Sequence, residues 1–284
     1  MKLKNYDLKL IRLFVVVIFG FAYQNSYSQK LTEDISLSKK IDETSGLEIV
    51  DGQFITHNDS GGDPKLYYLD KKGKIVFERT LEGVKNNDWE DITKDDQFIY
   101  VANMGNNFDT RKNLSIVKTP IDPSSSEAEL IEFNYPEQVK FTTAYNQSQY
   151  DAEALISIDD YLIILTKNKL KKITEIYALP KIAGKYEAKK IGSLNTQSII
   201  TGGDYDPDTK LLALTGTLIF NEYYILKIED FDLESKKDYK IDMYEIPIGK
   251  TQVEAIKIID SNTFWITSED EKSSSSARLM KIKL

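Results

Sequence analysis

The sequence predicts an all-β protein that forms a single β-propeller of five four-stranded blades. A motif recurs in which an apolar strand, a tight turn and a second apolar strand lead into a polar loop. Its copies start roughly 50 residues apart, with one longer spacing of 63, when they are aligned on Leu47, Ile92, Leu155, Tyr205 and Ile256. Short strands repeated at such a period are typical of propellers. No long apolar stretch has helical periodicity, so we expect few or no helices.

The first 28 residues have the layout of a secretory signal peptide. A basic segment precedes the apolar run 13–23, and the small residues Ser26 and Ser28 fit a cleavage site before Gln29. The apolar run is shorter than the roughly 20 residues that a membrane-spanning helix needs, which argues against the alternative of an N-terminal anchor. We therefore expect a signal peptide at 1–28 and a propeller domain at 29–284. The protein should be periplasmic or secreted, with no stable membrane insertion after cleavage.

Composition narrows the classes of partner. The chain has no cysteine, one histidine and a formal net charge of −8. A chain this acidic is a poor candidate for binding nucleic acid or an anionic membrane, and it suits a cationic ligand. Closing the ring removes exposed strand edges, so we expect a monomer.

Each copy of the motif extends to four strands. Alternating apolar, β-branched and aromatic residues after the first hairpin predict a third and a fourth strand in each of the first four copies. These strands are expected at 65–69 and 74–78, at 114–118 and 129–133, at 175–179 and 186–191, and at 223–228 and 239–246. The last copy has only 278–284, so its blade lacks one strand.

An N-terminal segment supplies the missing strand. Residues 35–41 precede the first copy and have no hairpin partner, so we expect them to pair on the outside of the last blade and close the ring. The excess length in the 63-residue spacing is expected to be an elaborated loop at 136–149. A sixth blade hidden in this spacing is the alternative.

Polar residues recur where the first strand of a copy starts and where its second strand ends. In a propeller blade these two points lie at the same end, so the residues are predicted to meet at one mouth of the central channel. They include His57, Asp59, Glu90, Asp91, Asn106, Asn107, Arg111, Glu153, Lys167 and Glu254. Carboxylates this close together raise one another's pKa unless a cation or a basic group neutralises them.

The carboxylates predict a divalent cation site. Hard oxygen ligands without cysteine favour Ca²⁺ or Mg²⁺ over zinc, and no organic cofactor is expected. The candidate metal ligands are Asp59, Glu90, Asp91, Glu153 and Glu254. As an alternative, each carboxylate accepts hydrogen bonds from backbone N–H groups and only holds the blades together.

The remaining candidates are ligand-binding and catalytic residues. Arg111, Lys167, Asn106 and Asn107 are expected to bind a small anionic or carbohydrate ligand, although both cations could instead pair with neighbouring glutamates. His57 could act as a general base or a metal ligand, and a hydrogen-bonded loop histidine is the plainer interpretation. Glu90, Glu153 and Glu254 are the other catalytic candidates.

Several segments together resemble a family of exported bacterial propellers. They are THNDSGGDPKLYYLD, NDWEDI, VANMGNNFDTR, YDAEAL, ILTKN and ITGGDYDPD. The chain resembles the group that includes the SdiA-regulated periplasmic propellers and the esterase-like phytase domains. The resemblance implies the propeller fold and Ca²⁺ binding. Residues 103–107 depart from the family pattern, because amides stand at two positions where acidic residues are expected.

These observations leave three functions open. The first is an exported propeller whose acidic mouth binds a divalent cation and a small ligand. The second is a metal-assisted hydrolase of phosphoesters or esters, in which a carboxylate-bound metal activates water. The third is a purely structural interaction scaffold. A propeller fold by itself does not decide among them.

Overall fold

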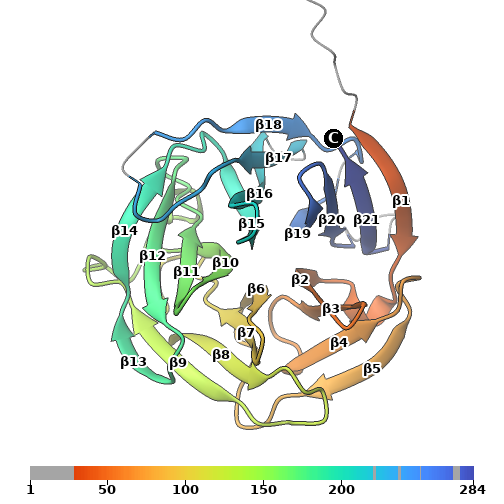
Figure 1. The fold of residues 1–284 in the computed structure, drawn as a ribbon. Helices are drawn as coiled ribbons and strands as arrows, with labels where there is room; N and C mark the ends of the chain where they lie inside the picture. Colours follow the sequence, from red (N-terminus) through yellow and green to blue (C-terminus); the bar gives the residue numbers. More distant parts are fainter. Residues whose placement is uncertain (1–28, 220–221, 236–237, 250, 271–275) are drawn as a thin grey trace, which may run out of the picture.

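The computed structural model describes residues 29–219, 222–235, 238–249, 251–270 and 276–284. These residues form a five-bladed β-propeller, as the sequence predicts (Figure 1). The signal peptide predicted at 1–28 lies outside the described residues. Within the described part of the chain, no helix is long and apolar enough to cross a membrane.

Each blade is built on four antiparallel strands, the first of which lines the central channel. The first blade contains β2 (Thr44–Val50), β3 (Gln53–Asn58), β4 (Lys65–Leu69) and β5 (Ile75–Thr80), and the second contains β6 (Trp89–Lys94), β7 (Phe98–Asn103), β8 (Leu114–Pro120) and β9 (Glu129–Asn134). The third contains β10 (Ala152–Ile158), β11 (Tyr161–Thr166), β12 (Thr174–Pro180) and β14 (Lys189–Leu194). The fourth contains β15 (Ile199–Asp206), β16 (Leu211–Ile219), β17 (Glu222–Ile228) and β18 (Asp242–Glu245). The fifth contains β19 (Val253–Asp260), β20 (Thr263–Ser268), β21 (Arg278–Lys283) and β1 (Lys30–Ser36).

The ring is closed by an N-terminal strand, as expected, but not by the residues expected. Strand β1 pairs antiparallel with β21, and Lys30 lies opposite Lys283. The prediction of a strand at 35–41 was too far along the chain, because Lys39–Ile41 forms a 3₁₀ turn instead. The Ser38 side chain caps this turn by accepting a hydrogen bond from the backbone N–H of Lys40. The turn directs the Ile41 side chain into the core, where it is fully buried.

The outer strand predicted at 186–191 divides into two strands that belong to different blades. Strand β13 (Gly184–Glu187) runs parallel to β9 and extends the second blade to five strands. The chain then passes through the buried Ala188, and β14 completes the third blade. The alternative of a sixth blade is wrong. The extra length in the second copy is a long connection with one short 3₁₀ turn, Tyr145–Gln147.

Burial differs between inner and outer strands because the blades pack face to face. Strands β10 and β11 are buried over most of their length, since neighbouring blades cover both of their faces. The outer strand β5 is largely exposed. The β2–β3 hairpin turns at Asp51 and Gly52, which both have positive φ, the backbone geometry that a two-residue hairpin loop favours. This packing holds the channel-lining strands rigidly and so fixes the residues at their ends.

Candidate metal centre

Irregularities in the channel-lining strands aim glutamates at the channel mouth. The pairing register shifts by one residue between Trp89 and Asp91, and the extra residue is Glu90. The same shift occurs around Glu153 in β10 and around Glu254 in β19. A bulge of this kind bends the strand and redirects a side chain, and bulges are common next to functional sites. Three blades therefore present a glutamate from the same structural position, and in β15 that position holds Thr201.

Two overlapping groups of carboxylates result. Carboxylate oxygens of Asp59, Asp88 and Glu90 lie within 4.8 Å of one another, and so do those of Glu90, Asp151 and Glu153. Glu90 belongs to both groups and is 5% exposed. Asp151 is fully buried and Glu153 nearly so. We call these five residues the acidic centre.

Burial and mutual repulsion raise the pKa values of carboxyl groups in the acidic centre. Burial raises the pKa of Asp59 to about 9, and the neighbouring charges of Asp88 and Glu153 add to the shift. Burial, followed by repulsion from Glu153 and Asp59, raises the pKa of Glu90 well above its ordinary value. Without a cation, Asp59 and Glu90 therefore retain protons at a pH at which isolated carboxyl groups have lost them.

Three cations surround the acidic centre. Lys167 Nζ lies 2.6 Å from Glu153 Oε1, and Lys169 Nζ lies 3.1 Å from Asp151 Oδ2. Burial opposes the charge on Lys167, but Glu153 and Asp151 raise its pKa well above the usual range. Arg111 Nη1 lies 4.0 Å from Asp88 Oδ2. Five carboxylates thus face three cations, before Glu254 and Glu269 are considered.

The polar loop after β7 connects these groups. The Asn106 backbone N–H donates to Asp151 Oδ1 at 2.7 Å, and the Asn106 side-chain oxygen accepts from the Arg111 backbone N–H at 2.9 Å. The Asn107 side-chain oxygen accepts from Lys169 Nζ at 2.5 Å. The Arg111 guanidinium donates to the Gly105 carbonyl oxygen at 2.6 Å. Arg111, Lys167 and Asn106 therefore contact the acidic centre directly, and Asn107 reaches it through Lys169.

Asp91 has a different role from its neighbour Glu90. Its two carboxylate oxygens accept hydrogen bonds from the backbone N–H groups of Ile92 and Leu155, both at 2.8 Å. Leu155 belongs to the next blade, so Asp91 links two channel-lining strands. Its oxygens are engaged with the backbone, and we leave it out of the acidic centre. Asp91 therefore has the structural role that the sequence analysis gave as the alternative to metal binding, in which a carboxylate accepts backbone hydrogen bonds and holds the blades together.

His57 and Glu254 lie at the edges of the site. His57 is fully buried, packs edge-on against the Trp89 ring and has its Nδ1 atom 3.1 Å from the Asn58 carbonyl oxygen. Burial lowers the pKa of His57 to about 4, so the ring is neutral at neutral pH. Burial, then the charges of Glu269 and Glu153, raises the pKa of Glu254 well above normal. Glu254 therefore favours its protonated form unless a cation neutralises the mouth, and it lies outside the two groups of closely spaced carboxylates.

The ligand and catalytic candidates drawn from the sequence lacked Asp88, Asp151 and Lys169, although strand direction places the two aspartates at the same mouth. A signal for the two aspartates is present, because each stands two residues before a bulge glutamate, in Asp88-Trp89-Glu90 and in Asp151-Ala152-Glu153. The repeated Asp-x-Glu spacing brings both carboxylates to one point only if the second residue is bulged. Strand alternation alone does not reveal the bulge.

The acidic centre fits a hard divalent cation. Asp59 Oδ1 is a buried oxygen atom that accepts no hydrogen bond, and such atoms are usually satisfied in native proteins. Gly105 leaves room for the carboxylates, because a Cβ at this position would collide with Glu90 Oε1 and Asp88 Oδ2. An oxygen-rich site with excess negative charge and no sulfur ligand is what Ca²⁺ and Mg²⁺ prefer.

Comparisons with known proteins find only distant likenesses to solved structures. No protein family model matches the sequence, and no curated protein matches it. Among solved structures, the PQQ-bound aldose sugar dehydrogenase from Streptomyces coelicolor is similar, with 11% identity, a TM-score of 0.49, and coverage of 90% of this chain and 98% of that one. The calcium-binding protein regucalcin from Agrobacterium tumefaciens has 10% identity, a TM-score of 0.44, and coverage of 86% and 92%. Likenesses this weak transfer no activity and no site residue, and the resemblance to exported propellers stays a prediction.

Proposed function

We propose that this protein is an exported β-propeller that binds a divalent cation at its channel mouth and uses that cation to hold a small anionic ligand. The observation that carries the proposal is the position of Glu90. Its buried carboxylate is shared between two groups of closely spaced carboxylates. A cation placed there neutralises both groups at once, which three peripheral basic side chains do not achieve.

Ca²⁺ is the cation we favour. It accepts six to eight oxygen ligands in flexible geometry, whereas Mg²⁺ demands a near-ideal octahedron. The carboxylates of the acidic centre come from three blades: Asp59 from the first, Asp88 and Glu90 from the second, and Asp151 and Glu153 from the third. Such a spread of ligands suits an ion that tolerates irregular coordination geometry. Asp59, Asp88, Glu90, Asp151 and Glu153 are the proposed ligands, and Glu254 supports them through its charge.

The ligand is proposed to approach from the open side of the mouth. Arg111 and Lys167 each keep 16% of the side chain exposed while they contact the acidic centre. Once a cation neutralises the carboxylates, these two side chains can attract an anion to the same place. A small molecule with a phosphate or carboxylate group fits this arrangement, and export to the periplasm or beyond follows from the predicted signal peptide.

Metal-assisted hydrolysis of an ester or phosphoester is the second candidate function. It is favoured by Asp59, which is only partly buried, has an oxygen atom without a hydrogen-bond donor, and has a pKa raised to about 9 by burial. A bound cation would lower that pKa, and the ionised Asp59 carboxylate could then accept a proton from the attacking water as a general base. The cation would supply a bound water as the nucleophile.

Calcium titration tests the proposed function. In the wild-type protein, Ca²⁺ at 100 times its dissociation constant should stabilise the fold by about 2.7 kcal/mol through mass action, and calorimetry should show saturable binding. Glu90→Gln should abolish most of this stabilisation. Glu245→Gln, on the exposed outer strand β18, is the matched control and should leave it unchanged. Flat titrations with Ca²⁺, Mg²⁺ and Mn²⁺ in the folded wild-type protein would overturn the proposal.

A further inference from the structure

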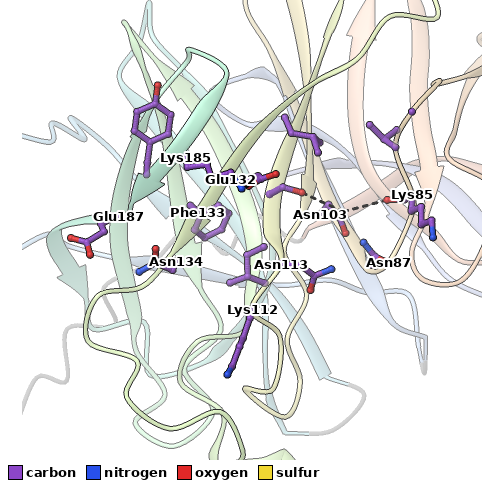
Figure 2. A pocket seen from close by; sticks show the side chains of 16 residues that line it. Lys85, Asn87, Asn103, Lys112, Asn113, Glu132, Phe133, Asn134, Lys185 and Glu187 are labelled. Carbon is purple, nitrogen blue, oxygen red and sulfur yellow. Dashed lines mark hydrogen bonds and ion pairs between the residues drawn. The ribbon is translucent and has the colours of Figure 1, made fainter.

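A groove of about 780 Å³ lies against the second blade (Figure 2) and adjoins the acidic centre at Asn103. The connection 83–87, the start of β8 and the ends of β9 and β13 line it. Asn103 joins the two places, because its side-chain oxygen accepts hydrogen bonds from the Asp88 backbone N–H and from the Arg111 guanidinium. The volume falls within the range of about 300 to 1,000 Å³ that is typical of pockets for small molecules.

The groove carries a small excess of positive charge, because its lining contains three lysines, Lys85, Lys112 and Lys185, and two glutamates, Glu132 and Glu187. Lys85 and Lys112 are exposed, and neither has a carboxylate oxygen within 4.0 Å among the described residues. Lys112 Nζ lies instead 4.5 Å from the centre of the Phe141 ring. Lys185 is paired with Glu132 at 2.7 Å. Free ammonium groups in one groove of a chain with a net charge of −8 indicate an anionic ligand.

Amide side chains line the groove between these charges. Asn87, Asn113 and Asn134 are exposed and contribute to its wall (Figure 2). A carboxamide offers two donors and an acceptor side by side. Neighbouring hydroxyl groups on a sugar ring have the complementary pattern, since each hydroxyl both donates and accepts. The amides therefore favour a polyhydroxylated ligand.

A peptide strand fits the groove less well. Peptides that bind at a sheet usually extend it by pairing with an exposed strand edge. The outer edge of β9 borders the groove, but β13 already covers it through parallel pairing from Gly184 to Glu187. The edge of β9 is thus occupied, and β13, which becomes the edge strand of this sheet, offers only four residues for pairing. Recognition therefore depends mainly on the lysine and asparagine side chains.

We infer that this groove binds an acidic oligosaccharide, with sugar carboxylates at Lys85 and Lys112 and sugar hydroxyls at Asn87, Asn113 and Asn134. This site is separate from the acidic centre and does not depend on the proposed cation. An acidic sugar placed here lies beside Arg111, at the rim of the channel mouth.

Titration with tri-galacturonic acid in the presence of EDTA tests this inference. The wild-type protein should bind it saturably in calorimetry, and maltotriose, which is neutral, should bind at least about tenfold more weakly. Lys85→Ala combined with Lys112→Ala should weaken binding by about tenfold or more, because each charged hydrogen bond that is lost commonly has this effect. Both side chains are exposed, so the melting temperature should not change. Lys71→Ala, in the exposed turn between β4 and β5, is the matched control.

A second readout does not depend on variants. In the wild-type protein, tri-galacturonic acid should shift the side-chain amide NMR signals of Asn87, Asn113 and Asn134. Absence of binding, binding unaffected by the double substitution, or unshifted asparagine signals would overturn the inference. Equal affinity for a hexa-aspartate peptide would overturn the assignment to saccharides. Because EDTA removes the cation, failure here is distinguishable from failure of the calcium titration.

Discussion

Gly105 and Glu90 share one space: the Oε1 atom of Glu90 lies where a side chain on residue 105 would begin. The same space adjoins Oδ2 of Asp88. The glycine thus allows the loop after β7 to close over two carboxylates, and the Arg111 guanidinium holds that loop by hydrogen bonding to the Gly105 carbonyl oxygen. The absence of a side chain at this position is a requirement of the acidic centre.

Gly105→Ala should therefore disrupt cation binding more than it disrupts folding. The added methyl group displaces Glu90 and Asp88, which removes the overlap between the two carboxylate groups, and we expect Ca²⁺ affinity to fall at least about tenfold. Gly62→Ala is the matched control, because a Cβ at that position has open space around it. Calorimetric titration of both variants checks the expectation. Equal affinity in Gly105→Ala and wild type would show that the cation binds elsewhere.

The candidate site was only partly predictable. The sequence indicates which residues reach the mouth, since strand direction alone places Glu90, Glu153, Arg111 and Lys167 at one end of the ring. It does not separate Glu90 from Asp91, which are adjacent and of the same charge. The bulge in β6 sends the first into the channel mouth and leaves the second bonded to the backbone of the next blade. A bulge depends on pairing with a partner strand, so no local pattern reveals it.

The free energy of unfolding of the cation-free protein should decrease as the pH rises. A salt-bridged carboxylate, whose pKa is lowered by folding, has the opposite effect. The folded-state pKa of Asp59, raised by burial to about 9, lies far above the unfolded value of about 3.9. The folded protein then binds more protons than the unfolded chain between these values, and stability decreases as the pH rises toward 9. In EDTA, scanning calorimetry should show a melting temperature that falls from pH 6 to pH 9.

Variants identify the groups responsible for this pH dependence. Asp59→Asn should flatten the decline, and saturating Ca²⁺ should do the same in the wild-type protein. Asp208→Asn, in the exposed turn after β15, should leave the decline unaltered. A melting temperature that rises with pH across this window would mean that the carboxylates are ionised and neutralised without a metal.

A second ionic group deeper in the channel should be important for stability. Lys257 Nζ lies 2.8 Å from Glu48 Oε1 and 2.9 Å from Asp204 Oδ1, and both carboxylates are more than nine-tenths buried. Lys257→Met leaves two buried carboxylates without their cation, and it should destabilise the fold by about 3 kcal/mol or more. Urea denaturation measures this change.

Two further variants show whether this loss is electrostatic. Adding Glu48→Gln and Asp204→Asn to Lys257→Met should recover most of the lost stability, because the uncompensated charges are then gone. Lys118→Met breaks a pair 3.9 Å long with the exposed Glu129, and it should cost less than about 1 kcal/mol. If the triple variant were no more stable than Lys257→Met alone, loss of packing rather than of charge balance would be the cause.

Closure of the ring gives a prediction about truncation. Removing 29–36 deletes β1 and exposes the edge of β21, while removing 29–41 also deletes the buried side chains of Leu37 and Ile41. The shorter truncation should lower the melting temperature, and the longer one should abolish cooperative unfolding. Thermal unfolding followed by circular dichroism distinguishes the two. A longer truncation that melts like the full protein would refute the closure.

The fold was predictable to the level of the blade and not to the level of every strand. The number of repeated hairpins predicts the number of blades, because each hairpin has the apolar faces that a blade needs to pack against its neighbours. The end of the outer strand in the third blade was not predictable, since 184–191 is a continuous β-type pattern that is divided between two sheets at Ala188. Its division depends on the free edge of β9, which belongs to a strand about 50 residues earlier in the chain.

The pairing of Lys30 with Lys283 has a consequence for biogenesis. The fifth blade cannot be completed until residues near the C-terminal end have left the ribosome, because its outermost strand comes from the N-terminal side of the chain. Contacts this distant in sequence form late and slowly. Until then, β1 remains without its partner strand. The full ring therefore assembles only after synthesis of the last strand, and a partly synthesised chain holds an open ring with unpaired strand edges.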